Sequence, residues 1–128
     1  MKKVLILIVD DEEDLLWMLG KRLTAEGYSV IAATNGADAV ALAKSRHPDI
    51  IVLDIIMPGM EGDEVAAELK EHPLTRNIPV IFLTALRSKE EEKKHGLSVG
   101  EHIALAKPLD PEVLLDQIKK LLPITADS

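Results

Sequence analysis

The chain has 128 residues, the size of one compact domain that can bury its own hydrophobic core, so we expect no second domain. Its composition, 47% hydrophobic and 29% charged, is typical of a soluble globular protein. The net charge of −7 argues against direct nucleic-acid binding, and the absence of cysteine excludes disulfides, thiolate metal sites and cysteine nucleophiles.

The first element is the continuous apolar run from Val4 to Val9, which is typical of a strand buried on both faces of a parallel sheet. This run is too short to span a membrane, and Asp10 follows it without the small-residue cleavage site of a signal peptide. We therefore expect a cytoplasmic protein with no membrane insertion.

A helix is predicted next, because Glu12, Glu13 and Asp14 place negative charge where the dipole of a first helical turn favours it. An apolar stripe follows, and Gly27 closes the helix. Trp17, the only tryptophan, is expected to be half-buried in packing.

The rest of the chain alternates between apolar runs and segments of helical period. Four more strands are predicted at 28–33, 49–53, 78–83 and 102–106, and four more helices at 37–46, 63–71, 88–97 and 111–122. The helix at 88–97 is expected to be short, because it is highly charged and includes Gly96. Strict alternation predicts an α/β fold, with a single doubly wound five-stranded parallel sheet and five helices.

Polar residues stand at the carboxyl ends of four predicted strands, where open parallel sheets bind their ligands. They are Asp10 and Asp11, Asp54, Thr84 and Lys107. Each has an ordinary alternative, since the aspartates could cap a helix or form a turn and the lysine could be solvated. Residues that serve only as caps or turns have no reason to converge on one edge of a sheet, so their convergence favours a functional site.

Three crowded carboxylates would repel one another unless a cation lay among them, and Mg²⁺ is the natural candidate for oxygen ligands. A carboxylate beside such an ion can act as a nucleophile toward phosphorus. Lys107 and the hydroxyl of Thr84 could then contact the oxygens of the transferring group. The pattern suggests an acyl phosphate on one of the aspartates.

Four motifs resemble those of the response regulator receiver family. They are Val9-Asp10-Asp11-Glu12, the segment from Leu53-Asp54 to Gly62, Phe82-Leu83-Thr84-Ala85 and Ala106-Lys107-Pro108. The resemblance covers residues 3 to about 122. It identifies 1–122 as a receiver domain and 123–128 as a tail or the start of a linker.

The resemblance implies a flavodoxin-like sheet of strand order 2-1-3-4-5 and phosphoryl transfer from a sensor histidine kinase, or a phosphotransfer protein, to Asp54. It implies Mg²⁺ held by Asp11, Asp54 and the backbone carbonyl of Ile56, with Asp10 contributing through water. Its expected output is a change in the surface formed by the fourth helix, fifth strand and fifth helix, which binds a downstream effector. The domain itself is expected to be a monomer or weak dimer and a signalling domain rather than an enzyme.

Three positions depart from the family pattern. Relatives commonly carry an aromatic residue three positions before the lysine, where this chain has Ala104. Ile56 and Leu86 stand where side chains in this family influence attack of water on the acyl phosphate, and neither can orient that water by hydrogen bonding. We therefore expect slow self-dephosphorylation. We also expect either that the signal travels by shifts of the backbone and the fourth helix, without reorientation of an aromatic ring, or that the output is unusual.

Other functions fit less well. A phosphatase of the haloacid dehalogenase type would need an Asp-x-Asp motif, but Ile55 and Ile56 follow Asp54. A flavodoxin would need a hydroxyl- and glycine-rich phosphate loop after the first strand, and the acidic residues that follow Val9 would repel its phosphate. The alternative that stays open is a receiver-like module that binds proteins without phosphorylation.

Overall fold

The computed structural model describes residues 3–57, 62–84, 103–107 and 109–122. It contains one five-stranded parallel sheet of order β2-β1-β3-β4-β5, as expected. The strands are β1 (Leu5–Val9), β2 (Ser29–Ala33), β3 (Ile50–Asp54), β4 (Val80–Thr84) and β5 (Ile103–Ala106).

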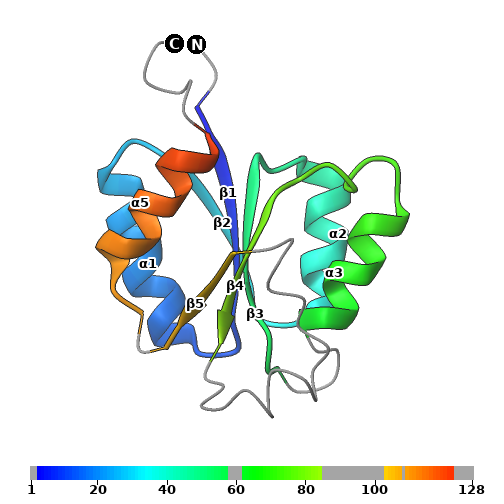
Figure 1. Cartoon of the computed structure of the whole chain (residues 1–128), viewed down its shortest axis with the longest axis horizontal. Coiled ribbons are helices and arrows are strands. Elements are labelled where there is room, and N and C mark those ends of the chain that lie inside the picture. The colour runs from blue at the N-terminus through cyan, green and yellow to red at the C-terminus, as the bar shows by residue number, and fades with distance from the viewer. Residues whose placement is uncertain (1–2, 58–61, 85–102, 108, 123–128) are drawn as a thin grey trace.

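Helices cover both faces of the sheet (Figure 1). They are α1 (Glu13–Ala25), α2 (Gly36–Arg46), α3 (Gly62–Glu71) and α5 (Pro111–Leu121). One face carries α1 and α5, and the other carries α2 and α3. The helix predicted at 88–97 lies outside the described residues. Among the described helices, none has the length and apolar character needed to cross a membrane.

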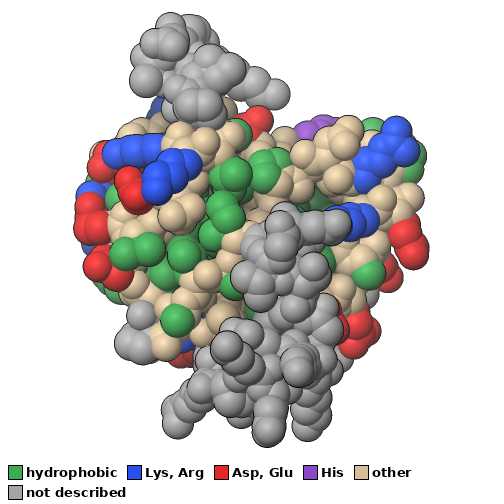
Figure 2. Space-filling view, viewed as in Figure 1, with side chains coloured by type: hydrophobic (Ala, Val, Ile, Leu, Met, Phe, Trp, Pro, Cys, Tyr) green, Lys and Arg blue, Asp and Glu red, His purple; other side chains and the backbone are tan. Residues whose placement is uncertain are grey.

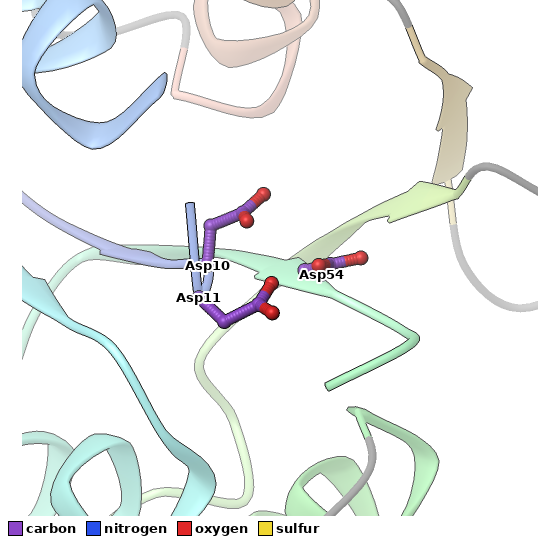
Figure 3. Close-up of side chains that lie close together, drawn as sticks. All are labelled: Asp10, Asp11 and Asp54. Carbon is purple, nitrogen blue, oxygen red and sulfur yellow. The ribbon is translucent and has the colours of Figure 1, made fainter. Parts of the chain in front are cut away.

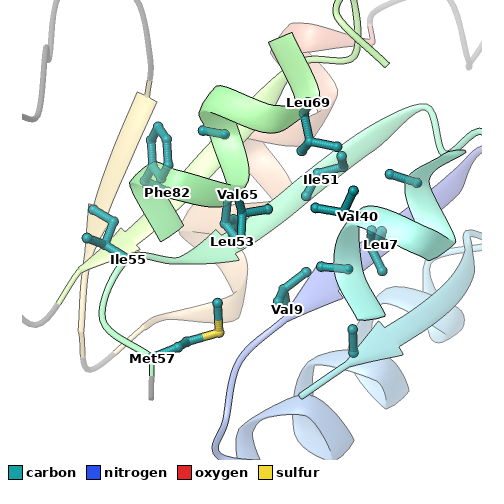
Figure 4. Packing of buried hydrophobic residues seen from close by; sticks show 14 residues of the cluster. Leu7, Val9, Val40, Ile51, Leu53, Ile55, Met57, Val65, Leu69 and Phe82 are labelled. Atoms are coloured by element: carbon teal, nitrogen blue, oxygen red, sulfur yellow. The ribbon is translucent and has the colours of Figure 1, made fainter. Parts of the chain in front are cut away.

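Two apolar cores lie on the two sides of the sheet, because neighbouring residues of each central strand point to opposite faces. Leu7, Val9, Ile51 and Leu53 pack under α2 and α3 (Figure 4). Ile6, Ile8, Ile50 and Val52 pack under α1 and α5. The uninterrupted apolar runs of β1 and β3 follow directly from this burial on both faces.

Side-chain caps determine where two of the helices begin. The side chain of Asn35 accepts a hydrogen bond from the N–H of Asp38 at 2.9 Å and so starts α2. Asp110 accepts one from Glu112 at 2.9 Å and, with Pro111 in the first turn, starts α5. Both caps satisfy N–H groups that have no partner within the helix.

The expectation for Trp17 was wrong, because its side chain is 67% exposed. The buried stripe of α1 consists of Leu16, Leu19 and Leu23, which recur at the helical period. A residue next to the start of that stripe is turned about 100° away from the sheet. The tryptophan therefore lies on the surface of α1.

The surface over α5 and β5 is less polar than the flanks of the molecule. Figure 2 shows hydrophobic side chains gathered on this face, with charged side chains mainly toward the edges. Ile103 and Leu105 of β5 are only partly buried, and Val113 of α5 is exposed. Apolar area of this kind marks interaction surfaces when it is contiguous.

Candidate functional site

The site lies at the edge of the sheet where the parallel strands reach their carboxyl ends. Asp10 and Asp11 follow β1, Asp54 is the last residue of β3, Thr84 is the last residue of β4, and Lys107 follows β5. Because β1, β3, β4 and β5 are neighbours in the sheet, their ends converge at one place. The backbone N–H of Lys107 donates to the carbonyl of Thr84 at 2.8 Å, which joins the last two strand ends.

Three carboxylates form the acidic part of this site (Figure 3). Oxygens of Asp10, Asp11 and Asp54 all lie within 4.8 Å of one another. Asp10 and Asp54 are buried, whereas Asp11 is exposed. The buried Oδ2 of Asp10 has no hydrogen-bond partner among the described residues.

These residues fit a hard divalent cation. Carboxylate oxygens are what Mg²⁺ prefers, and three carboxylates this close repel one another unless positive charge lies among them. Asp10, Asp11 and Asp54 offer such oxygens from two adjacent strands. One of the three carboxylates, that of Asp11, is exposed, whereas the other two are buried.

Lys107 supplies the positive charge of the site. Its Nζ lies 2.8 Å from Oδ2 of Asp10, an ion pair that lacks the angles of a hydrogen bond. The same ammonium donates to Oδ2 of Asp54 at 3.3 Å and to Oε1 of Glu12 at 3.0 Å. It therefore holds together the ends of β1 and β3 from its place after β5.

The electrostatics of Asp54 differ from those of a solvated aspartate. Burial raises the pKa of Asp54 to about 6, and the charge of Asp10 adds to this effect. The ammonium of Lys107 and the N–H of Ile56 partly offset it. Asp54 is therefore mostly ionised at neutral pH, while its carboxylate is more basic than an ordinary one.

Lys107 keeps its charge despite burial. Burial lowers its pKa, but contacts with Asp10, Glu12 and Asp54 more than compensate, so the pKa lies above the ordinary lysine value. The ammonium is therefore charged throughout the physiological range. Its side chain can neutralise an anion that enters the site.

Two further residues position the acidic groups. Oδ1 of Asp10 accepts the N–H of Glu12 at 2.9 Å, so Asp10 organises the turn before α1, although the N-cap residue of that helix is Glu12 and no side chain caps it. The N–H of Ile56 donates to Oδ1 of Asp54 at 3.3 Å, and the side chain of Ile56 is 42% exposed beside the site. Both oxygens of Asp54 thus have partners, one on the backbone and one on Lys107.

Glu12 is a residue of the site that the sequence did not single out. It was expected to supply charge to the first turn of α1 and stood at the end of the first motif without a role of its own, but its carboxylate contacts Lys107. The available signal was its place directly after Asp10 and Asp11. The contact itself depends on where β5 delivers the lysine, which no local pattern shows.

Gly62 brings α3 against the strand that carries Asp54. Its N–H donates to the carbonyl of Ile55 at 2.7 Å. A Cβ at this position would lie 2.5 Å from the carbonyl oxygen of Asp54 and 2.6 Å from Cα of Ile55. Only glycine permits this close approach of two backbones.

The arrangement defines a class of protein. A doubly wound parallel sheet with carboxylates and a lysine at its carboxyl edge is an α/β domain built to hold a charged group at that edge. Comparison with known families gives the particular one: residues 6–119 match the family model "Response regulator receiver domain". The chain belongs to the response regulator receiver family.

Individual relatives agree with this assignment. The chain is 43% identical to the response regulator PleD of Caulobacter vibrioides over 91% of its own length and 25% of PleD. It is 39% identical to the protein PilH of Pseudomonas aeruginosa over 91% of the chain and 96% of PilH. It thus spans a quarter of PleD, and 51% of the phosphate regulon regulatory protein PhoB of Pseudomonas aeruginosa, to which it is 41% identical.

Solved structures show the same fold. The chemotaxis protein CheY4 of Vibrio cholerae superposes with a TM-score of 0.83 at 32% identity, covering 94% of this chain and 99% of CheY4. A response regulator from Desulfuromonas acetoxidans gives a TM-score of 0.81 at 32% identity, covering 94% of this chain and 97% of that one. The flavodoxin-like strand order expected from the sequence is therefore confirmed.

Proposed function

We propose that this receiver domain accepts a phosphoryl group on Asp54, in a Mg²⁺-dependent transfer from a sensor histidine kinase or phosphotransfer protein. The observation that carries the proposal is the convergence of Asp54 with two other aspartates and with Lys107. An acidic cluster alone would serve only to bind a cation. The added ammonium is what a site needs to receive a transferring phosphoryl group.

Asp54 is the best nucleophile of the three aspartates. Asp10 already uses Oδ1 for the turn into α1 and buries Oδ2 against Lys107, and Asp11 is exposed. Asp54 is ionised at neutral pH, more basic than usual and in contact with the ammonium. An oxygen of Asp54 forms the new bond to phosphorus as the bond from phosphorus to the donor histidine nitrogen breaks, and that nitrogen keeps the bonding electrons.

The other groups of the site act on the charge that this transfer brings. Asp10, Asp11, Asp54 and the backbone carbonyl of Ile56 would hold Mg²⁺, which when bound neutralises charge on the phosphoryl oxygens. Lys107 provides the second positive charge, and the hydroxyl of Thr84 donates a hydrogen bond to a phosphoryl oxygen. The exposed apolar side chain of Ile56 offers no hydrogen bond to an attacking water, which slows loss of the phosphoryl group.

The output follows from the connection of Lys107 to the sheet. Lys107 directly follows β5, and its backbone N–H donates a hydrogen bond to the carbonyl of Thr84 at the end of β4. A displacement of the Lys107 side chain therefore acts on the ends of β4 and β5. Ala104, partly buried in β5, has no ring that could reorient. The signal therefore passes through the backbone to the surface over α5, β5 and the predicted helix at 88–97, where a downstream effector protein or domain binds.

The domain boundaries, the cellular location and the kind of partner are part of the same proposal. Residues 1–122 form the receiver, and 123–128 form a tail or the start of a linker. The relatives include PilH, which the chain spans almost completely, and PhoB, which it spans by half. We place the domain in the cytoplasm, with protein partners rather than direct contact to nucleic acid, in keeping with its charge of −7.

The test is intact-mass spectrometry after incubation with acetyl phosphate and Mg²⁺. The native chain is compared with Asp54→Asn and with Asp116→Asn, a control whose side chain is exposed on α5. A single phosphoryl adduct on the native chain and on the control, but not on Asp54→Asn, is expected. An adduct that persists on Asp54→Asn contradicts the assignment of the acceptor.

Absence of the adduct from all three proteins would point to the phosphorylation-independent interaction module. The same incubation with a histidine kinase as donor, followed by calorimetric titration with Mg²⁺, separates a poor small-molecule donor from a silent site. A chain that neither takes a phosphoryl group nor binds Mg²⁺ refutes the proposal.

A further inference from the structure

A groove of about 590 Å³ lies between α1 and the edge strand β2, outside the acidic site. Its walls are apolar side chains that include Leu16 and Val30, and Lys21 is the only charged residue that lines it. The residues Trp17 and Gly20 of α1 also line it. Three features of this groove bear on what could cover it.

The first feature is the exposure of Trp17. Two-thirds of this side chain is accessible, and the Nζ of Lys21 lies 4.4 Å from the centroid of its ring. A tryptophan buries a large apolar area when it is covered, and tryptophan is enriched among the residues that dominate interface energies. Within the described part of the domain the ring is covered only in part, by the ammonium of Lys21, and most of its apolar area stays exposed.

The second feature is Gly20, in the middle of α1. Glycine in a helix interior costs about 1 kcal/mol relative to alanine. A Cβ at Gly20 would have no atom within 4 Å, so no contact among the described residues requires glycine there. A group from outside that packs directly on the backbone of α1 would require it.

The third feature is the unprotected edge of the sheet. β2 is the terminal strand and pairs with β1 alone among the described strands. Its sequence, Ser29 to Ala33, contains no charged residue and no proline. Soluble proteins usually protect such edges with lysine, proline or a bulge, so an uncharged edge is open to pairing with another strand.

We propose that a second copy of this chain occupies the groove, in a two-fold dimer in which Trp17 of each copy packs over Gly20 of the other and the two β2 edges face each other. A two-fold interface must be self-complementary. This face satisfies that condition, because a projecting aromatic ring and an open space lie one helical turn apart on the same helix. A single two-fold axis normal to the sheet brings both helices and both strands together in antiparallel pairs.

The charges of α1 match the antiparallel arrangement. Glu13 and Asp14 lie in its first turn, and Lys21 lies two turns later without an ion-pair partner among the described residues. When residue 17 faces residue 20 of the partner, Asp14 falls about 3 Å along the axis from Lys21 of the partner, at 1.5 Å per residue. The acidic first turn of α1 in each copy therefore lies beside Lys21 of the other copy.

The dimer is expected to be weak. Each copy carries a net charge of −7, and at physiological salt repulsion is screened beyond about 8 Å. Association should therefore strengthen as salt is added from low concentration, and should be detectable between about 10 µM and 1 mM protein. It needs neither phosphorylation nor Mg²⁺, so its test is independent of the function proposed above.

The experiment is sedimentation equilibrium on the native chain over that concentration range, with Trp17 emission recorded in parallel. The weight-average mass is expected to rise from 14.0 kDa toward twice that value, and the emission of this single tryptophan to shift to shorter wavelength. Gly20→Glu should remain monomeric, because its side chain fills the open space with charge. Ala32→Lys places a charge on the exposed edge of β2 and should also abolish association.

Leu74→Glu is the matched control, since Leu74 is an exposed apolar residue outside the groove. It should associate like the native chain, and circular dichroism should show that all variants are folded. A native mass that stays at 14.0 kDa up to about 1 mM overturns the proposal. Dimers that survive both Gly20→Glu and Ala32→Lys, or that are lost equally in Leu74→Glu, overturn it as well.

Discussion

Replacing Asp54 with asparagine should stabilise the metal-free domain at neutral pH. In the folded chain the pKa of Asp54 is raised from 3.8 to about 6, chiefly by burial. Two pKa units correspond to about 3 kcal/mol of free energy that ionisation costs the native state. Water at the open edge of the sheet screens part of this cost, so we expect a gain of about 1–2 kcal/mol in the free energy of unfolding.

The gain should depend on pH in a defined direction. Because the folded state binds the Asp54 proton more tightly than the unfolded chain, rising pH lowers native stability between about 4 and 6. Asparagine has no proton to lose. The difference between Asp54→Asn and the native chain should therefore be near zero at about pH 4 and reach its full value above about pH 7.

Urea unfolding, monitored by circular dichroism in the presence of a chelator, measures both the gain in the free energy of unfolding and its dependence on pH. Mg²⁺ should then reverse the order, because an ion at a hundred times its dissociation constant stabilises the native chain by about 2.7 kcal/mol, while the variant has lost a ligand. A variant that is no more stable than the native chain at pH 7.5 in chelator refutes the electrostatic account of the site. A difference in the free energy of unfolding that is the same at about pH 4 and at pH 7.5 refutes it as well.

Three further predictions concern the residues around Asp54. Gly62→Ala should lower the free energy of unfolding by about 2–3 kcal/mol, because the added Cβ meets backbone atoms of Asp54 and Ile55. Gly20→Ala should not lower it, because a Cβ there meets no atom of the described residues. Urea unfolding of the two variants measures the difference. Lys107→Met should slow phosphorylation about 100-fold yet bind Mg²⁺ more tightly in calorimetry, because a competing cation is removed. Ile56→Asn should speed loss of the phosphoryl group about tenfold, measured by intact mass, since one hydrogen bond to water is worth about 1.4 kcal/mol; an unchanged rate contradicts the proposed shielding.

The order of strands and helices along the chain could be predicted because each strand has a recognisable apolar run in the sequence. Runs such as Val4 to Val9 are apolar at every position, and this happens only where both faces of a strand are covered. The observed bounds of the described strands agree with the predicted ones to within two residues. The candidate site followed from the same logic, because polar residues that directly follow such runs must lie at one edge of a parallel sheet.

The details of the site required the tertiary structure. Asp10 and Asp11 are neighbours in the chain, yet one is buried and the other exposed. The contact of Glu12 with Lys107 joins residues that are 95 positions apart, and only the placement of β5 beside β4 creates it.

The amino-acid sequence by itself thus determined the alternation of strands and helices, the parallel direction of the strands and the identity of the residues at the strand ends, because these depend on local pattern and on chain direction. Only the tertiary structure decided that Trp17 is exposed and that a Cβ at Gly20 would meet no atom of the described residues, because both depend on how distant segments pack around α1. A sequence pattern reports what a residue prefers. Its surroundings are decided when distant segments pack together.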